Sequence, residues 1–446
     1  MKKWLNIIIL FLLLGLGFTL NFLPHLNYNY PLHVDEWVHF TYSEHISDNT
    51  PLYFGGESNS LETGFHMLLA FINLIGVPYL IMFKFFAGFL TILISLALFI
   101  LVRRIWTERA ALFSVLFITV LKSSVLLLGP MFLVPMSIGL FLIPIGFFLS
   151  LYCKKILFLI IAALLIIHPP SAIALLILIN CYLIVERNHV KQLLYQQGLG
   201  ILISLPLYIP LLLRYKESTL GIVNFDIYPG TIFIPEYFGI LFTLLIIIGI
   251  FFLINKAQYT VILYSISLLI LVLLFYHYNL DILVPYRRVL MYLFEALAIC
   301  FGVGCSWIIS RFNKYREVAL VILILILLVF SVPGKIDSTK KVYHLIDDKD
   351  YKSFTWVKDS IFIDITVLLD PWKAIAFTPI AGQEVYSRVP QGYNETYINR
   401  NEEIYKFFKN KCVDKKLLEE NKITLIYGDC GNNLKKLTEN VYLIYK

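Results

Sequence analysis

The chain of 446 residues has few charged side chains. Lys, Arg, Asp and Glu make up 15% of it, against about 25% in ordinary soluble domains. Hydrophobic residues make up 59%, and the mean hydropathy is +0.77. This composition excludes a water-soluble globular enzyme and indicates a protein that crosses a membrane several times. The net charge of +7 does not indicate nucleic acid as a partner, because membrane proteins gather Lys and Arg in cytoplasmic loops.

The few charges are unevenly distributed. Gly334–Lys446 holds 18 Lys and Arg and 16 Asp and Glu, which is 34 of the 67 charged residues. We therefore predict a transmembrane domain at 1–333 and a soluble α/β domain at 334–446. The β-rich runs and the helical spacings in the second part are typical of such a domain: Ile363–Leu369, Thr424–Tyr427 and Val441–Tyr445 as strands, and Asn401–Asn410 and Asp414–Asn421 as helices.

Long apolar runs fill the first 333 residues. About 20 helical residues cross a hydrocarbon layer, and the sequence predicts about eleven spans: Trp4–Leu23, Tyr79–Val102, Ala110–Leu128, Phe132–Tyr152, Ile156–Ile167, Ala172–Val185, Gly198–Leu213, Tyr237–Ile254, Tyr259–Tyr276, Val289–Ile309 and Val318–Val332. The first run lacks a small-x-small cleavage site, so we expect it to be retained. Gly64–Ile75 is too short to cross and is predicted as a juxtamembrane or re-entrant helix.

With eleven spans, the Lys and Arg residues of the short loops lie on one side of the membrane. The positive-inside rule then predicts a multi-pass protein of the cell membrane with a cytoplasmic N-terminus and an extracytoplasmic C-terminal domain. The first external loop is 24–61, and the chemistry is expected on this outer face. Of the six cysteines, Cys412 and Cys430 fall in the external domain, where they form either a disulfide or two free thiols.

The first external loop holds the most informative cluster. His33, Asp35, Glu36 and His39 lie a few residues after the first span. If the chain is helical after Pro31, Asp35 and His39 share one helix face and Glu36 points elsewhere, so one carboxylate can react while the other orients or binds. The alternative is that both carboxylates only favour the positive N-terminal end of a helix.

A second cluster precedes a late span. Arg287 and Arg288 follow Tyr286 on the predicted outer side, against the positive-inside pattern, and the guanidinium fork suits a lipid phosphate. The alternative is that Arg288 pairs with Glu295, seven residues later on the same helix face. His168, in an outer turn before two prolines, contacts a polar substrate or caps a helix.

Together these features resemble the GT-C glycosyltransferases, polytopic enzymes that use polyprenyl-phosphate-linked sugars. The resemblance rests on the Asp35-Glu36 loop, the Gly64 segment, Arg104 at a cytoplasmic helix end, His168-Pro169, the external arginines, and a helix, strand, Asp370-Pro371 and Gly382 pattern in the tail. The Trp-Trp-Asp motif of the oligosaccharyltransferase branch is absent, because Trp356 and Trp372 are isolated. The branches that transfer monosaccharides, such as the protein O-mannosyltransferases, are more similar.

The resemblance implies a single inverting displacement. Asp35, with Glu36 beside it, would be the general base, and Arg287 or Arg288 would contact the phosphate of a polyprenyl-phosphate-sugar donor; His39, His168 and Tyr286 complete the predicted substrate site. The acceptor would be a glycan, lipid or protein hydroxyl. A divalent metal would find ligand types in His33, Asp35, Glu36 and His39, but without a known spacing, so we expect no required cofactor. The alternative functions are a transporter or lipid flippase, and a catalytically silent scaffold of the same fold.

Overall fold

The computed structural model describes residues 2–49, 61–214, 237–280, 284–389, 395–430, 435–438 and 440–444. The chain forms two compact units. The helical unit comprises the described residues of 1–29, 49–222 and 228–342. The tail unit comprises Tyr30–Asp48 together with the described part of Tyr343–Lys446. The segment that follows the first helix therefore belongs to the same compact unit as the C-terminal part of the chain.

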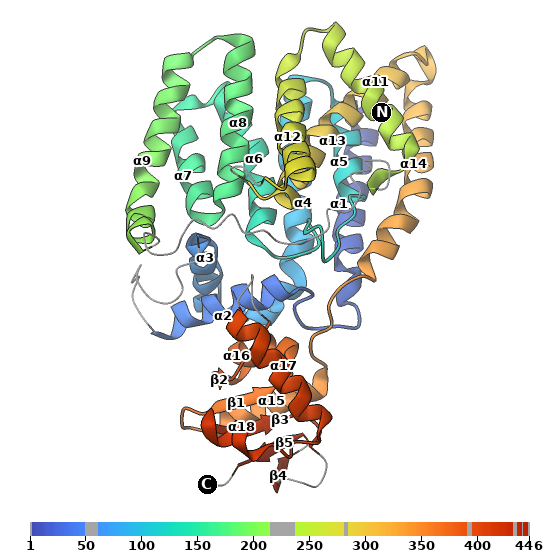
Figure 1. The fold of residues 1–446 in the computed structure, drawn as a ribbon. Coiled ribbons are helices and arrows are strands. Elements are labelled where there is room, and N and C mark those ends of the chain that lie inside the picture. Colours follow the sequence, from blue (N-terminus) through green and yellow to red (C-terminus); the bar gives the residue numbers. More distant parts are fainter. Residues whose placement is uncertain are drawn as a thin grey trace. The chain divides into compact units, whose positions relative to one another are not determined.

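The helical unit consists of apolar helices packed along one another (Figure 1). Their bounds are α1 Lys2–Phe22, α3 Thr63–Leu74, α4 Tyr79–Ile105, α5 Glu108–Thr119, α6 Pro135–Tyr152, α7 Leu157–Ile167, α8 Pro169–Glu186, α9 Val190–Arg214, α11 Ile240–Asn255, α12 Tyr259–Tyr278, α13 Tyr286–Ser310 and α14 Arg316–Thr339. Short 3-10 turns lie at Leu23–His25, Lys154–Ile156 and Asn313–Tyr315. The predicted juxtamembrane segment forms α3, a helix of 12 residues.

Seven described helices are long and apolar enough to cross a membrane: α1, α4, α6, α8, α12, α13 and α14. The prediction of a polytopic helical protein is confirmed, while the count of eleven spans stays a prediction. The predicted span Ala110–Leu128 is wrong in its second half, because α5 ends at Thr119. The residues that follow include Lys122, Ser123 and Ser124 and then Gly129-Pro130, and such residues favour turns over a continuing helix.

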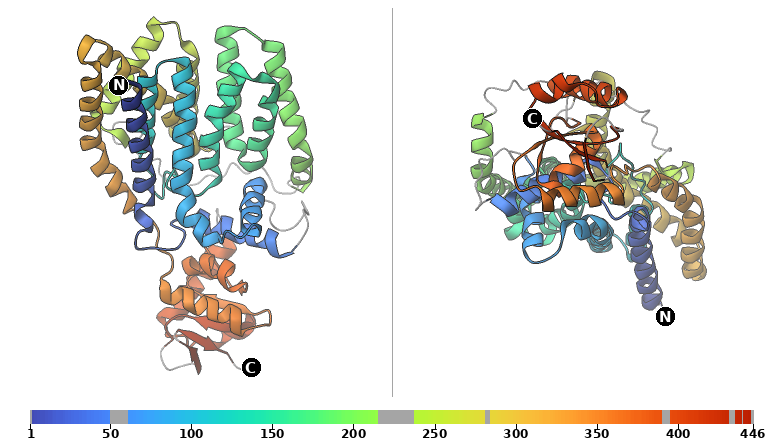
Figure 2. Two further views of the ribbon diagram at one scale, coloured as in Figure 1. Left: turned by 180° about the vertical axis from the view of Figure 1, so that it is seen from behind. Right: turned by 90° about the horizontal axis from the view of Figure 1, so that it is seen from below.

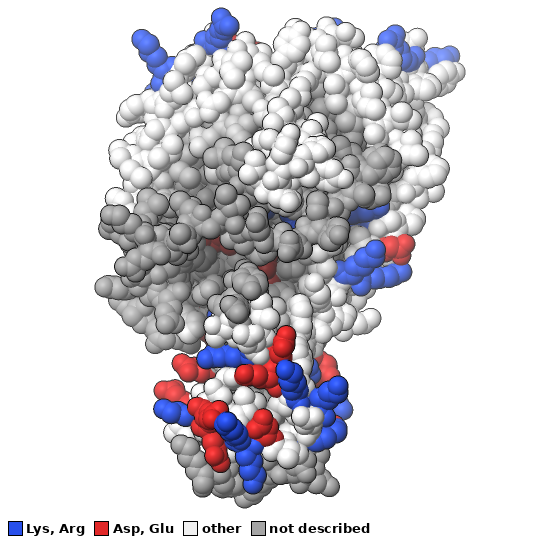
Figure 3. All heavy atoms as spheres, viewed as in Figure 1, with Lys and Arg blue, Asp and Glu red and all other residues white. Residues whose placement is uncertain are grey.

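The outer surface of the helical unit is apolar where a membrane would contact it. Phe11 on α1 and Phe330 on α14 are 70% and 72% exposed. The two helices lie side by side, as the views in Figures 1 and 2 show. On the face in Figure 3, the described atoms of this unit are mostly uncharged, and Lys and Arg show at the top and at the right edge of the view. Large exposed apolar areas of this kind are found where lipid replaces water.

Helix α13 is the buried centre of the helical unit, and glycines allow its close packing. A Cβ atom at Gly302 would overlap the carbonyl oxygen of Ala110 on α5, and one at Gly304 would overlap that of Leu245 on α11. On the facing helix, Gly249 approaches the carbonyl of Cys300 in the same way. Small residues at such crossings let helix backbones approach closely in membrane proteins. The start of α13, which carries Tyr286, Arg287 and Arg288, is thereby held firmly.

The tail unit contains a five-stranded mixed sheet, as the predicted α/β domain requires. Its elements are α2 Val34–Asn49, α15 Asp348–Ser360, β1 Thr366–Leu369, α16 Pro371–Ala381, β2 Glu384–Val385, α17 Glu395–Lys409, α18 Lys415–Glu420, β3 Ile423–Tyr427, β4 Lys435–Thr438 and β5 Val441–Leu443. The strand order is β2-β1-β3-β5-β4. Strand β1 pairs in parallel with β2 and β3, and β5 pairs antiparallel with β3 and β4.

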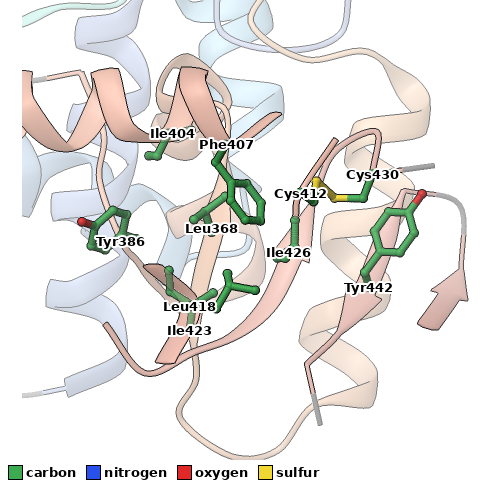
Figure 4. Packing of buried hydrophobic residues seen from close by; sticks show 10 residues of the cluster. All are labelled: Leu368, Tyr386, Ile404, Phe407, Cys412, Leu418, Ile423, Ile426, Cys430 and Tyr442. Atoms are coloured by element: carbon green, nitrogen blue, oxygen red, sulfur yellow. A yellow bond between two sulfur atoms is a disulfide. The ribbon is translucent and has the colours of Figure 1, made fainter. Parts of the chain in front are cut away.

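One hydrophobic core joins this sheet to α17 and α18 (Figure 4). Leu368 and Ile426 from the central strands pack with Ile404 and Phe407 from α17. Cys412 and Cys430, at the border of the same core, are joined by a disulfide. Strand β1 contributes Leu368 to this core, whereas Phe377 of α16 packs on Phe354 of α15. Asp370 and Trp372 lie at the junction of β1 and α16.

Candidate functional site

Candidate residues occur in both units, and those of the tail unit begin with Asp35. This residue lies in the first turn of α2, where a carboxylate is favoured by the positive end of the helix. Its side chain is 37% exposed. Its backbone N–H donates to His33 Nδ1 at 3.0 Å, which leaves the proton of a neutral imidazole on Nε2. Asp35 thus combines a fixed backbone with a carboxylate that a substrate can reach.

Glu36, the neighbouring carboxylate predicted for the site, has a different environment. Its side chain is fully buried, and Oε2 accepts hydrogen bonds from the backbone N–H groups of Leu32 at 2.7 Å and His33 at 3.1 Å. A helix start leaves such donors without intrahelical partners, and the Glu36 carboxylate satisfies two of them. The geometry gives Glu36 a positioning function, because it fixes the turn from which Asp35 projects.

The predicted helix after Pro31 is present, so Asp35, His39 and Tyr42 follow one another on one face of α2. His39 is buried and Tyr42 is half-buried. His39 therefore lies beneath the exposed carboxylate rather than beside it on the surface.

Residues of the C-terminal part hold the Asp35 segment from several directions within the tail unit. The Tyr343 N–H donates to the Leu32 carbonyl at 3.0 Å, and the Tyr30 hydroxyl donates to Asp348 at 2.8 Å. Glu44 pairs with Lys358 at 3.5 Å. These contacts join positions about 300 residues apart in sequence, so the conformation of the Asp35 segment depends on the tail.

The candidate residues of the helical unit gather around Glu62, which is the N-cap residue of α3. Its Oε1 lies 3.3 Å from Arg288 Nη2 and 3.5 Å from His168 Nε2. The predicted alternative that Arg288 pairs with Glu295 is wrong, because Arg288 pairs with Glu62. Neither carboxylate oxygen of the buried Glu295 has a hydrogen-bond partner among the described residues. Helix α13 turns Glu295 into the bundle, away from the end at which Arg288 lies half-exposed.

His168 belongs to the same cluster and is completely buried. Nδ1 lies 2.5 Å from the Ser171 hydroxyl and 3.2 Å from that of Tyr292, and the two hydroxyls are 2.7 Å apart. The capping alternative is wrong: His168 is the N-cap residue of α8, but its side chain caps no backbone group there. Burial first, and the charge of Arg288 second, lower the pKa of His168 well below its ordinary value, so this imidazole is neutral.

Tyr286 and Arg287 precede Arg288 on the first turn of α13. The Tyr286 ring stacks on Phe275 of α12, with ring centroids 4.0 Å apart, and Arg287 is half-buried. The stacked tyrosine fixes the start of the helix. The backbone that carries the side chains of Arg287 and Arg288 is therefore ordered.

Sequence reasoning missed Glu62 and Tyr292. Glu62 is an isolated acid near the end of a long loop, and Tyr292 is one of several aromatic residues in an apolar helix. The one available signal was the spacing of Arg288 and Tyr292 at i and i+4, which places both on one face of α13. Their partners come from α3 and α8, and no local pattern predicts those contacts.

A metal site would need several ligands that converge. Within the part of the chain that the structure describes, no three His, Cys, Asp or Glu side chains do so.

No family model and no curated protein matches the sequence. Solved structures do match the fold. The oligosaccharyltransferase of Archaeoglobus fulgidus, tethered with an acceptor peptide, matches with a TM-score of 0.60 and 11% identity, over 95% of this chain and 69% of its own. AglB from that organism, in complex with an inhibitory peptide and a dolichol-phosphate, gives 0.60 and 12% over the same shares. ArnT of Cupriavidus metallidurans in the apo state gives 0.56 and 12%, over 94% of this chain and 92% of its own.

The chain has the GT-C fold. The predicted fold class is confirmed by this likeness together with the helical unit and the sheet of the tail unit. The oligosaccharyltransferase and ArnT share this fold, and at 11–12% identity the likeness shows the fold alone.

Proposed function

We propose that this protein is a membrane glycosyltransferase that moves a monosaccharide from a polyprenyl-phosphate-linked donor to an acceptor hydroxyl on the outer face. The observation that carries the proposal is the GT-C fold over 94% of this chain and 92% of ArnT. AglB has been solved with a dolichol-phosphate, which supports a lipid-linked donor. The absent Trp-Trp-Asp motif favours a branch that transfers monosaccharides.

The reaction is a single displacement at the anomeric carbon. The acceptor oxygen forms a bond to this carbon while the bond to the phosphate oxygen breaks, and the configuration inverts. The acceptor proton passes to the Asp35 carboxylate, and the polyprenyl phosphate leaves with the bonding electron pair. General-base assistance of this kind contributes about 10²–10⁴-fold to the rate. Asp35 suits the task because its carboxylate is accessible while its backbone is fixed by His33.

Arg288, with Arg287 beside it, is proposed to hold the phosphate of the donor. A guanidinium fork matches two phosphate oxygens and stabilises the charge that develops as the phosphate leaves. Glu62 pairs with Arg288, so a phosphate would compete with this carboxylate. Tyr286 and His168 in the helical unit, and His39 in the tail unit, are proposed to contact the substrates.

The orientation completes the proposal. The N-terminus would be cytoplasmic, and the tail unit with Asp35 would be extracytoplasmic, in agreement with the positive-inside pattern. This places an aqueous acceptor and a membrane-embedded donor on the same side as the proposed base.

The test compares the wild-type protein with Asp35→Asn, each purified and placed in nanodiscs with radiolabelled polyprenyl-phosphate sugars and a membrane extract. The substitution keeps the size of the side chain and removes its basicity, so we expect transfer to fall by about 10²-fold or more with donor binding unchanged. Asp364→Asn, an exposed acid in the same unit, is the matched control. Full activity of Asp35→Asn would end the assignment of the base.

The same assay separates the alternatives. A lipid flippase would move the labelled lipid between leaflets without cleaving it, and a silent scaffold would neither cleave nor flip it. A transporter of this kind is expected to place ionisable groups near the centre of the membrane, and the buried Glu295 favours it. Transbilayer movement lost in Glu295→Gln, with no sugar transfer by the wild-type protein, would establish that function instead.

A further inference from the structure

A row of three rings leads from the Asp35 segment onto the tail. The His33 and Tyr343 ring centroids are 5.6 Å apart, and those of Tyr343 and Trp372 are 5.8 Å apart. At the other end, His33 Nδ1 lies 3.7 Å from the Asp35 carboxylate. All four residues belong to the tail unit. The row therefore joins the proposed base to an aromatic surface on α16.

Trp372 is held firmly although its ring is open to solvent. Its backbone N–H donates to Asp370 Oδ1 at 2.9 Å in the N-cap of α16. Its side chain is nevertheless 39% exposed. A capped helix start thus presents a large aromatic ring that is partly open to solvent.

A fixed aromatic face of this kind suits a sugar ring. One side of a pyranose presents C–H groups that carry a small positive charge, and the face of an aromatic ring is negative. The hydroxyl groups of the sugar lie at its rim and stay in water. An uncharged peptide backbone offers no comparable flat apolar face, and an extended chain would instead need strand edges or pockets.

The acids close to the row disfavour an anionic acceptor. Asp370 caps α16, Asp348 accepts the Tyr30 hydroxyl, and the buried Asp350 pairs with Lys373 at 2.6 Å. The Tyr427 hydroxyl donates to the same Asp350 oxygen. Lys373 is thus neutralised by a carboxylate, and Asp348 and Asp370 would repel a phosphate or a carboxylate group on the acceptor.

We propose that the acceptor of the transfer is an uncharged carbohydrate, and that Tyr343 and Trp372 form the surface on which it stacks. The acceptor sugar would lie along the row with the reacting hydroxyl directed to Asp35. This inference rests on the proposed function, because it names the acceptor class of that reaction. Tyr343 and Trp372 contact the acceptor and not the donor.

The kinetic test uses the full chain in nanodiscs. Trp372→Ala and Tyr343→Ala should each raise the acceptor KM about tenfold with kcat little changed, and the affinity for polyprenyl phosphate should stay at the wild-type value. Trp372→Phe should keep the acceptor KM close to the wild-type value, since it keeps an aromatic face. Phe362→Ala is the control, because Phe362 is an aromatic residue of the same unit that is 89% exposed. The labelled product should resist protease and be degraded by periodate.

A binding arm separates this inference from the proposed function. Saturation-transfer NMR on Asp35→Asn, which cannot react, uses the uncharged hexasaccharides of glucose, mannose, arabinose and N-acetylglucosamine as probes. We expect transfer of saturation to at least one probe and its loss in Asp35→Asn with Trp372→Ala. A product that protease digests, or the absence of saturation transfer to all four probes, overturns the carbohydrate acceptor while sugar transfer itself stands. If the wild-type protein binds a probe but does not cleave the donor, the proposed function is overturned instead.

Discussion

Arg288 is held by a carboxylate that lies far from it in the sequence. Glu62 on α3 lies between Arg288 and His168, and His168 is fixed in turn by Ser171 and Tyr292. A guanidinium that is already oriented by one carboxylate can exchange it for the oxygens of a phosphate without a large loss of side-chain entropy. The arrangement prepares Arg288 for an anion.

Substitution of Arg288 tests this interpretation. We expect Arg288→Ala to weaken the binding of polyprenyl phosphate about 10- to 100-fold, because a hydrogen bond to a charged group contributes about 1.5–3 kcal/mol. Arg288→Lys should bind with intermediate affinity, since it keeps the charge but not the fork. Binding is measured by fluorescence titration in nanodiscs. Arg311→Ala, at the other end of the same helix and stacked on Trp307, is the control; equal affinity of all variants would move the phosphate site elsewhere.

Glu36 offers a second test at the scale of single residues. Glu36→Ala leaves the buried N–H groups of Leu32 and His33 without an acceptor, and an unsatisfied buried group costs about 1–3 kcal/mol. We expect faster amide hydrogen exchange over residues 30–48 and a lower unfolding temperature, with a smaller effect for Glu36→Gln. Asp35→Ala should leave the exchange of this segment unchanged. Unchanged protection in Glu36→Ala would contradict the positioning function.

Sequence reasoning names candidate residues but not their partners. Arg288 stands out because an external arginine departs from the positive-inside pattern, and Asp35 because it lies in a cluster of two carboxylates and two histidines after a span. The i, i+7 spacing of Arg288 and Glu295 suggested a pair on one helix, but tertiary packing supplied Glu62 from α3. The burial of Glu36 was equally invisible, because adjacent acids look alike in sequence until the turn before the helix is known.

Helix α13 shows how elements are held together in the helical unit. Its glycines face the backbones of α5 and α11, so close van der Waals contact replaces the hydrophobic effect, which has little force between helices in lipid. Its first turn carries the proposed phosphate site. The packing of one helix therefore determines the position of the arginines.

A matched pair of glycine substitutions tests this packing. Gly304→Ala adds a Cβ that would overlap the Leu245 carbonyl on α11, whereas Gly15→Ala on α1 adds one with nothing within 4 Å. Both gain the same helix propensity, so their difference reports the overlap. We expect Gly304→Ala to lower the free energy of unfolding by about 1–3 kcal/mol relative to Gly15→Ala, measured by unfolding in mixed micelles. A difference near zero would show that α11 and α13 can separate freely.

Hydropathy predicted the elements of the helical unit with one clear error. The apolar run Ala110–Leu128 continues through residues that the structure places outside a helix, because α5 stops at Thr119. In the tail, the predicted strands and helices match β1, β3, β5, α17 and α18, with shifted ends. Strands β2 and β4 were missed, since a strand of two residues or one rich in lysine has no apolar alternation.

At the scale of the whole molecule, the chain divides into two units that interleave in sequence. The tail unit takes residues 30–48 from the beginning of the chain. No periodicity or composition signals this, because the contacts are single hydrogen bonds, ion pairs and ring contacts between distant segments. The sequence therefore predicted a membrane part and a soluble part, but not that the proposed base belongs with the latter.

Removal of the disulfide tests how far the stability of the tail unit depends on it. The two cysteines are 18 positions apart, and closing a loop of this length stabilises a domain by about 3 kcal/mol in the chain-entropy model. We expect Cys412→Ser with Cys430→Ser to make residues 395–430 sensitive to protease at a lower temperature, with the far-ultraviolet signal of the helices unchanged. Cys153→Ser, an exposed free cysteine, is the control. Unchanged proteolysis would mean that the core of the tail does not depend on the bond.

The late position of the tail has a consequence for biosynthesis. Tyr343, Asp348 and Lys358, which hold the Asp35 segment, leave the ribosome after α14, when every helix of the helical unit has been made. Until then the segment with the proposed base has none of these contacts and the aromatic row is incomplete. Chains whose synthesis stops before the tail would therefore carry the helices of the helical unit but an unassembled segment around the proposed base, and the proposed transfer would begin only after residues 343–372 have been made.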